Sequence, residues 1–239
     1  MNELFQYLSY SFRAKHQGGF GIHSPYVFHL VSYIIEEHLP YYAYSLVEKI
    51  RERMADGPEK KKTKKELPAK YAQLLFRLAN SYQPSQIVHI GAETGLTDLY
   101  FSHVDGKKNV SVVSAQKEEA ERIMTLSKKY GKSNVTGYYA SDYAVAYGKL
   151  VEQVKGKHLL YLEDVSAEQL SAIIDTNLNA MEGGNAFVII RQPRSSSEKT
   201  ALWEKLKQDE RVKVTIELFR LGLIISNPDL QKENFVLKF

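Results

Sequence analysis

Two glycines four residues apart, Gly91 and Gly95, follow an apolar run at 87–90 in the segment GAETG. Glycine adopts backbone conformations that other residues avoid, so this spacing favours a tight turn whose backbone can approach a ligand at a helix N-terminus. Ala92 and Glu93 belong to the same candidate binding turn. The segment lacks the G-x-G-x-x-G pattern of nicotinamide enzymes and the G-K-S/T pattern of phosphate loops, which disfavours both classes.

Charged side chains follow two later apolar runs. Glu163 and Asp164 come directly after one run, and Arg191 and Arg194 come after the next. The two carboxylates could bind a metal ion, act as a general base, or lie on a solvated loop. The two arginines would repel a divalent cation, which disfavours a metal-dependent reaction. They could contact an anionic group of a substrate or lie on the surface without a special role.

An alternation of apolar runs and helical stretches must position these residues. Strands are expected at 87–90, 110–113, 135–139, 159–162 and 187–190, and helices at 118–130, 143–154, 167–181 and 198–208. Apolar strands separated by helices predict a parallel sheet covered on both faces, with right-handed crossovers. The β-rich runs 212–218 and 221–226 are separated by only two residues, so we expect an antiparallel hairpin, with 235–239 as a further edge strand. The fold class predicted is therefore a doubly wound α/β sheet with a C-terminal hairpin.

Helices are also expected before this sheet. Ser24-Pro25 is a start signal for a helix, because serine caps free amides and proline is favoured in the first turn. Another helix opens at Pro68, and Ser195 with Glu198 forms a possible capping box for the last helix. Amphipathic stripes in the first part of the chain need a partner surface, and the earliest consists of Leu4, Phe5, Leu8 and Phe12. The expected organisation is a helical section at 1–57, a lysine-rich linker at 58–67 and an α/β domain at 68–239.

The segment IVHIGAETGLTDLYF, which follows a helix ending in a proline turn, resembles motif I of class I S-adenosylmethionine-dependent methyltransferases. The five α/β units and the hairpin agree with the Rossmann-like fold of that family. A closer resemblance is to a group of methyltransferase-like proteins of bacteroidete type that carry G-I-H-S-P-F/Y-V-F, matched here by GIHSPYVF at 21–28. The likeness extends to AQLLFRLANSYQP and VTIELFRLGLIIS, so it spans most of the chain.

The resemblance implies S-adenosylmethionine as the cofactor, bound by the glycine turn, Ser114 and Asp142. In such enzymes an acidic residue usually ends the second strand and accepts both ribose hydroxyls, whereas this chain has Ser114. His89 replaces an acid often found two residues before the first glycine. Asp142 matches a carboxylate that accepts from the adenine amino group, although it could equally cap the following helix. We therefore expect cofactor binding weaker than in an intact site.

The resemblance also bears on the reaction. Metal-dependent O-methyltransferases need an acid and an amide after the fifth strand, where this chain has Arg191 and Gln192. The leading hypothesis is a metal-independent methyltransferase of unknown acceptor, with the N-terminal helices covering the substrate side. The alternative is a catalytically inactive descendant that keeps the fold as a binding or scaffolding module, and a third hypothesis is an RNA-associated protein.

Composition narrows the remaining classes. The chain of 239 residues has no cysteine, which excludes a disulfide framework and thiolate zinc sites. The start MNELFQYLSYSF lacks the features of a signal peptide, and no apolar run approaches the roughly 20 residues needed to cross a bilayer, so we expect a cytoplasmic protein. A net charge of +4 is low for a nucleic-acid binder, and the KKKTKK run at 60–65 is expected to be a solvated linker.

Three histidines in the N-terminal section are candidates for metal ligands. The spacings between His16, His23 and His29 do not place two ligands on one helical face, so we expect no metal site. His23 is instead expected to be a structural residue, hydrogen-bonded where the N-terminal helices meet the α/β domain.

Overall fold

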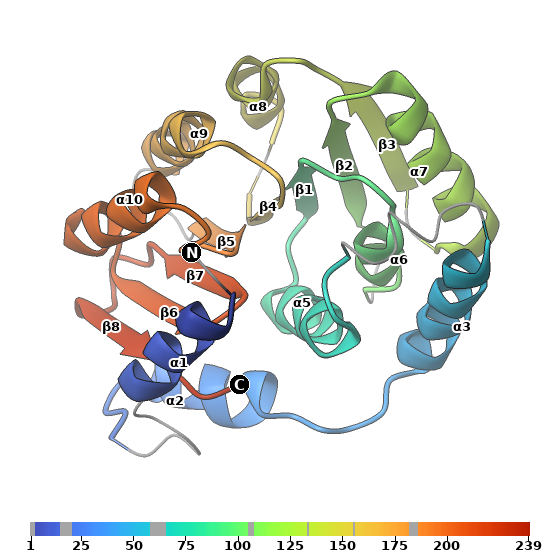
Figure 1. The fold of residues 1–239 in the computed structure, drawn as a ribbon. Coiled ribbons are helices and arrows are strands. Elements are labelled where there is room, and N and C mark those ends of the chain that lie inside the picture. The colour runs from blue at the N-terminus through green and yellow to red at the C-terminus, as the bar shows by residue number, and fades with distance from the viewer. Residues whose placement is uncertain are drawn as a thin grey trace.

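The computed structural model describes residues 3–14, 21–57, 66–104, 108–132, 134–154, 156–181 and 186–239. An eight-stranded sheet runs through the molecule in the order β3-β2-β1-β4-β5-β7-β6-β8 (Figure 1). Its strands are β1 (Gln86–Ile90), β2 (Asn109–Ser114), β3 (Asn134–Tyr139), β4 (His158–Leu162), β5 (Ala186–Arg191), β6 (Val214–Leu218), β7 (Leu221–Ile225) and β8 (Glu233–Val236). The first five strands pair in parallel, and β7 is antiparallel to both of its neighbours. The predicted doubly wound sheet with a C-terminal hairpin is therefore confirmed.

Helices cover both faces of the sheet because the strands are buried on both sides. The helices that follow residue 66 are α5 (Ala69–Tyr82), α6 (Leu96–Ser102), α7 (Lys117–Tyr130), α8 (Tyr143–Val151), α9 (Ala167–Ala180) and α10 (Ser197–Gln208). The first three pack in one hydrophobic cluster and the last three in a second cluster across the sheet. The last helix begins one residue later than the expected capping box implies. Its N-cap is Ser196, whose side chain accepts from the Lys199 amide at 3.2 Å, so the assignment to Ser195 was wrong.

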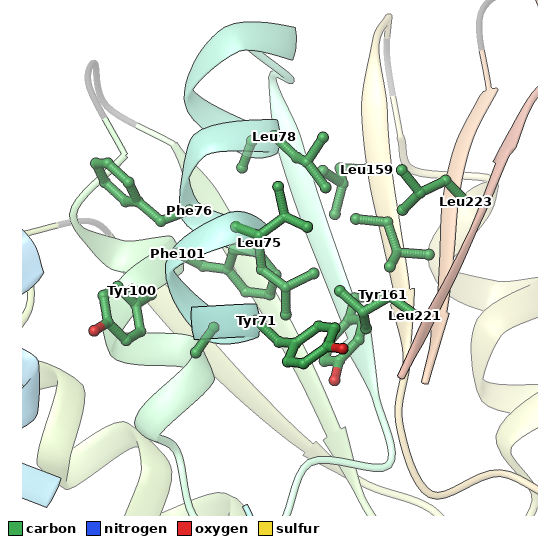
Figure 2. Packing of buried hydrophobic residues seen from close by; sticks show 14 of the residues in the cluster. Tyr71, Leu75, Phe76, Leu78, Tyr100, Phe101, Leu159, Tyr161, Leu221 and Leu223 are labelled. Atoms are coloured by element: carbon green, nitrogen blue, oxygen red, sulfur yellow. The ribbon is translucent and has the colours of Figure 1, made fainter. Parts of the chain in front are cut away.

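The central core lies between α5 and the sheet. Leu75 and Leu78 of α5 face Leu159 of β4 and Leu223 of β7, as Figure 2 shows. The predicted apolar face of this helix is buried, and so is most of its opposite side, because the N-terminal helices cover it. Gln83 ends the helix in a left-handed conformation, with φ of 51°, immediately before Pro84.

The N-terminal helices share this core. They are α1 (Glu3–Arg13), α2 (Pro25–Leu30), a π-helical turn η1 (Val31–Ile35) and α3 (Tyr42–Asp56). Ser24 caps α2 as expected, accepting from the Val27 amide at 3.4 Å. Arg77 of α5 donates to the carbonyls of Ile34 at 2.7 Å and Ile35 at 3.0 Å, so it satisfies backbone oxygens that the end of the π-helical turn would leave without partners. The division of the chain at 58–67 stays a prediction: residues 58–65 lie outside the described part, and Leu67 is buried.

The orientation of α1 differs from the expectation. The apolar stripe of Leu4, Phe5, Leu8 and Phe12 faces solvent, with Phe12 85% exposed. The opposite side of the helix packs on the sheet, where Tyr10 is buried and its hydroxyl donates to the Leu237 carbonyl. Arg13 forms an ion pair with Glu217 of β6 at 2.9 Å. Polar and aromatic contacts, rather than the apolar stripe, therefore fix this helix.

Over the ranges described, no helix combines the length and the apolar character that a bilayer span requires.

Candidate functional site

The glycine turn lies at the position where the sheet reverses its strand order. β1 is flanked by β2 and β4, whose connections leave on opposite faces, and ligands of open α/β sheets bind at such a switch point beyond the carboxyl ends of the strands. Gly91 has φ of 85° and Gly95 has φ of 88°, a left-handed region that favours glycine. The predicted tight turn is confirmed, and it delivers the chain into the N-terminus of α6.

The turn is packed closely against its surroundings. A Cβ atom on Gly91 would lie 2.7 Å from the Asp164 amide nitrogen, and one on Gly95 would lie 3.1 Å from a carbon of Ile123. Ala92 is buried, whereas Glu93 is half-buried and its carbonyl accepts a hydrogen bond from Arg122. The surface that the turn offers to a ligand is therefore concentrated at Glu93.

Ser114 ends β2 as expected, but its side chain turns inward. Its hydroxyl donates to the Ala92 carbonyl at 2.7 Å, and the residue has no exposed surface. The hydroxyl thus ties the end of β2 to the glycine turn. The next two residues, Ala115 and Gln116, are exposed.

Asp142 is the N-cap of α8. Its Oδ1 accepts from the amides of Ala144 at 2.9 Å and Val145 at 3.0 Å. This confirms the capping interpretation. The adenine contact stays a prediction, because Asp142 is exposed and these two bonds engage only one of its carboxylate oxygens.

A buried charge network lies beneath the turn. His89 of β1 bonds through Nδ1 to Asp98 of α6 at 2.8 Å and through Nε2 to Glu163 at 3.0 Å. All three side chains are at most 5% exposed. Burial alone would lower the pKa of His89, but the two carboxylates outweigh it and raise the pKa to about 10. The imidazole is therefore a buried cation at neutral pH.

Glu163 joins this network to β5. Its Oε1 accepts from Arg191, the last residue of that strand. Burial alone would raise the pKa of Glu163, but the bonds from His89 and Arg191 hold the pKa below its ordinary value. The interpretation of Glu163 as part of a solvated loop is therefore wrong, whereas Asp164 next to it is exposed.

Three polar side chains near this network were missed from the sequence. Glu66 and Tyr161 lie close enough to influence Glu163 electrostatically, and burial followed by the charge of Glu163 raises the pKa of Glu66 to about 8. Among the described residues, Glu66 Oε2, Asp98 Oδ2 and the Tyr161 hydroxyl are buried without a hydrogen-bond partner. The available signals were an aspartate inside the apolar helix LTDLYFS and a tyrosine inside the apolar strand HLLYL.

The remaining predicted residues lie apart from the turn. Arg194 donates to Glu217 at 2.9 Å and to Glu204 at 2.5 Å, on the side of the sheet edge near β6. His23 is exposed, so the expectation of a packed structural histidine was wrong. His16 lies outside the described residues, as does the lysine run at 60–65. Across the described ranges, no three acidic, histidine or cysteine side chains are grouped in a way that could hold a metal ion.

Comparisons by sequence identify no family. No family model matches the chain. A component of the nuclease SbcCD of Staphylococcus epidermidis, the SbcC protein, matches in two strains and is 29% identical over 153 residues. That stretch is 61% of this chain but only 14% of the nuclease component, so the chain spans a small part of the curated relatives that it matches.

Comparisons by structure identify the fold. The SAH-bound methyltransferase PaMTH1 of Podospora anserina superposes with a TM-score of 0.57 at 14% identity, covering 85% of this chain and 96% of that one. A methyltransferase of Geobacter sulfurreducens gives 0.55 at 14% identity, covering 80% and 92%. An O-methyltransferase of Bacillus cereus, in complex with SAH, gives 0.54 at 13% identity, covering 81% and 94%. The chain therefore has the fold of these methyltransferases, with a mostly parallel sheet closed by an antiparallel hairpin.

Proposed function

We propose that this protein is an S-adenosylmethionine-dependent methyltransferase whose cofactor binds at the turn Gly91–Gly95. The observation that carries the proposal is the left-handed glycine turn at the switch point of a sheet with the strand order 3-2-1-4-5-7-6. The SAH-bound proteins of similar fold support it.

The residues at the turn fit an adenosyl ligand in part. The two left-handed glycines allow close approach of the backbone, and Glu93 and Asp142 expose carboxylates at the same edge of the sheet. Ser114 is occupied by its bond to Ala92, so the exposed Gln116 is the better candidate to bond the ribose hydroxyls. When bound, the cofactor supplies an electrophilic methyl group, and the task of the protein is chiefly to align an acceptor with it.

The proposed reaction needs no metal ion. The acidic position after β4 is Glu163, and the position at the end of β5 is Arg191. Their ion pair places a guanidinium where a divalent cation would need a ligand, and two cations at that distance would repel each other. Addition of Mg²⁺ or of a chelator is therefore expected to leave cofactor affinity unchanged.

Thermal unfolding with and without SAH or S-adenosylmethionine tests the proposal. Ligand at about 100 times its dissociation constant should stabilise the protein by about 2.7 kcal/mol. Gln116→Ala should weaken the stabilisation, whereas Lys117→Ala, at the exposed neighbouring position, should not. The absence of a shift at millimolar ligand would contradict the proposal.

A second candidate is a non-catalytic module that keeps the fold. The inward bond of Ser114 and the close packing around Gly91 favour it, because both reduce the surface available to a cofactor. This candidate predicts no stabilisation by SAH in the same experiment.

A further inference from the structure

A cavity of about 150 Å³ lies at the same edge of the sheet, beyond β5 and β6. Helix α1 contributes Tyr10 and Arg13 to its wall, the loop after β5 contributes Gln192 and Arg194, and the β6–β7 turn contributes Phe219. A cavity of about this volume holds a molecule the size of benzene.

The charge lining this cavity is positive. Arg13, Arg194 and Arg220 face a single carboxylate, that of Glu217. Glu217 already accepts two bonds from Arg13 and one from Arg194, at 2.9 to 3.1 Å, and a further bond from the Trp203 indole at 3.2 Å. A carboxylate supplied with so many donors has little capacity for another cation, so the cavity favours an anion.

The guanidinium groups keep donors for such an anion. Arg13 gives two of its five N–H groups to Glu217, and Arg194 gives one to Glu217 and one to Glu204. Three N–H groups of each guanidinium are not used in these bonds. The planar arrangement of these donors matches the oxygens of a carboxylate or phosphate.

The opposite part of the wall is aromatic. The rings of Tyr10 and Phe219 lie 5.4 Å apart between centroids, and Tyr7 contacts Phe219 edge-on at 5.2 Å. These contacts hold the two lining rings in place, where they can pack against an apolar group of a ligand.

Two strained residues border the cavity. Gln192 has φ of 49° and Phe219 has φ of 54°, although neither is glycine. The Arg220 amide donates to the Leu218 carbonyl at 2.6 Å, and the Gln192 amide donates to the Arg220 carbonyl at 2.7 Å. Left-handed conformations in such residues cost about 1–3 kcal/mol each and cluster at ligand sites.

We propose that this cavity binds a ring-sized organic anion, with its carboxylate or phosphate on Arg13 and Arg194 and its ring against Tyr10 and Phe219. β5 lies two strands from β1, which places the cavity roughly 10 Å or more across the sheet edge from the glycine turn. The anion is then the methyl acceptor, an identification that rests on the proposed function, whereas the binding of the anion does not.

Titration of the protein with benzoate, phenyl phosphate and the neutral benzamide, without S-adenosylmethionine, tests the binding. We expect saturable binding of one of the two anions, and the preferred one identifies the acidic group. Benzamide should bind about tenfold more weakly or worse, because it lacks the charge-assisted bonds. No saturable binding of either anion at millimolar concentration, or equal binding of benzamide, would overturn the proposal.

Variants locate the site. Arg194→Gln should lower the affinity for the anion about tenfold. Arg211→Gln removes a surface arginine that pairs with Asp209 and Asp175, and should leave the affinity unchanged. Ser9→Trp fills the cavity from an exposed position on α1 without removing an ion pair, and should abolish binding. Unaltered affinity in both Arg194→Gln and Ser9→Trp would show that the anion binds elsewhere.

Measurement of SAH binding on the same preparations separates the two proposals. Anion binding without SAH binding would leave the cavity in place and refute the methyltransferase. SAH binding without anion binding would do the reverse.

Discussion

His89 illustrates how a single substitution reshapes a site. It occupies a position where related folds often have an acid, and it turns two neighbouring carboxylates, Asp98 and Glu163, into partners. Glu163 in turn holds Arg191 at the end of β5. The result is a buried chain of alternating charges that connects α6, β1, β4 and β5 beneath the candidate cofactor turn.

Glu163→Gln should be strongly destabilising. It removes a carboxylate between two buried cations, His89 and Arg191, and loss of one partner from a buried ion pair typically costs about 3–5 kcal/mol. Asp164→Asn, at the exposed neighbour, should change the free energy of unfolding by less than about 0.5 kcal/mol. Urea unfolding measures both. Similar values for the two variants would show that the network contributes little.

The stability of the protein should fall as pH rises above neutrality. The folded pKa of His89, about 10, is above its ordinary value of 6.5, so the stabilisation is complete below pH 6.5 and is lost as pH approaches 10. Glu66, with a pKa raised to about 8, adds a loss of the same sign between its ordinary value of 4.5 and 8. Urea unfolding of the wild type and of His89→Asn at pH 6 and pH 9 checks the imidazole contribution. A pH dependence of equal size in both proteins would contradict it.

At the scale of elements, the glycine turn was predictable and the charge network was not. The turn is local: Gly91 and Gly95 determine the conformation of a short segment after an apolar strand. The network needs Asp98 and Glu163, which are 65 positions apart in the chain and meet only because β4 pairs with β1. Strand order therefore decides which charges meet, and spacing along the sequence does not reveal it.

The orientation of α1 was not predictable for a related reason. The stripe of Leu4, Phe5, Leu8 and Phe12 predicted the buried side from apolarity alone. The contacts that decide the orientation, Tyr10 with Leu237 and Arg13 with Glu217, join residues more than 200 positions apart. An amphipathic pattern cannot anticipate partners supplied by the other end of the chain.

Gly91→Ala should destabilise the turn. A left-handed conformation costs a residue with a Cβ atom about 1–2 kcal/mol, and that atom would lie 2.7 Å from the Asp164 amide, which is backbone and cannot move aside easily. Gly148→Ala is the matched control: its Cβ would meet nothing within 4 Å, and alanine in a helix should stabilise by about 0.5–1 kcal/mol. Thermal unfolding compares them. An equal or higher stability of Gly91→Ala would contradict the geometry of the turn.

At the scale of the whole molecule, the candidate sites share one edge of the sheet. The carboxyl ends of the parallel strands carry the glycine turn and the charge network, and the β6–β7 turn carries the anion cavity. Helix α1, from the start of the chain, packs against this last part, near β6 and β7 in Figure 1. The chain thus brings its N-terminal helix to the place where an acceptor would meet the cofactor.

The binding position of SAH decides whether the glycine turn is a cofactor site. Backbone amide NMR spectra of the isotope-labelled protein, recorded with and without SAH, report which residues sense the ligand. We predict the largest shift changes at Gly91, Glu93, Gly95 and Gln116, with smaller ones at Tyr143 after the α8 cap. Spectra that stay unchanged at millimolar SAH, or that change only at residues far from this edge, would contradict it.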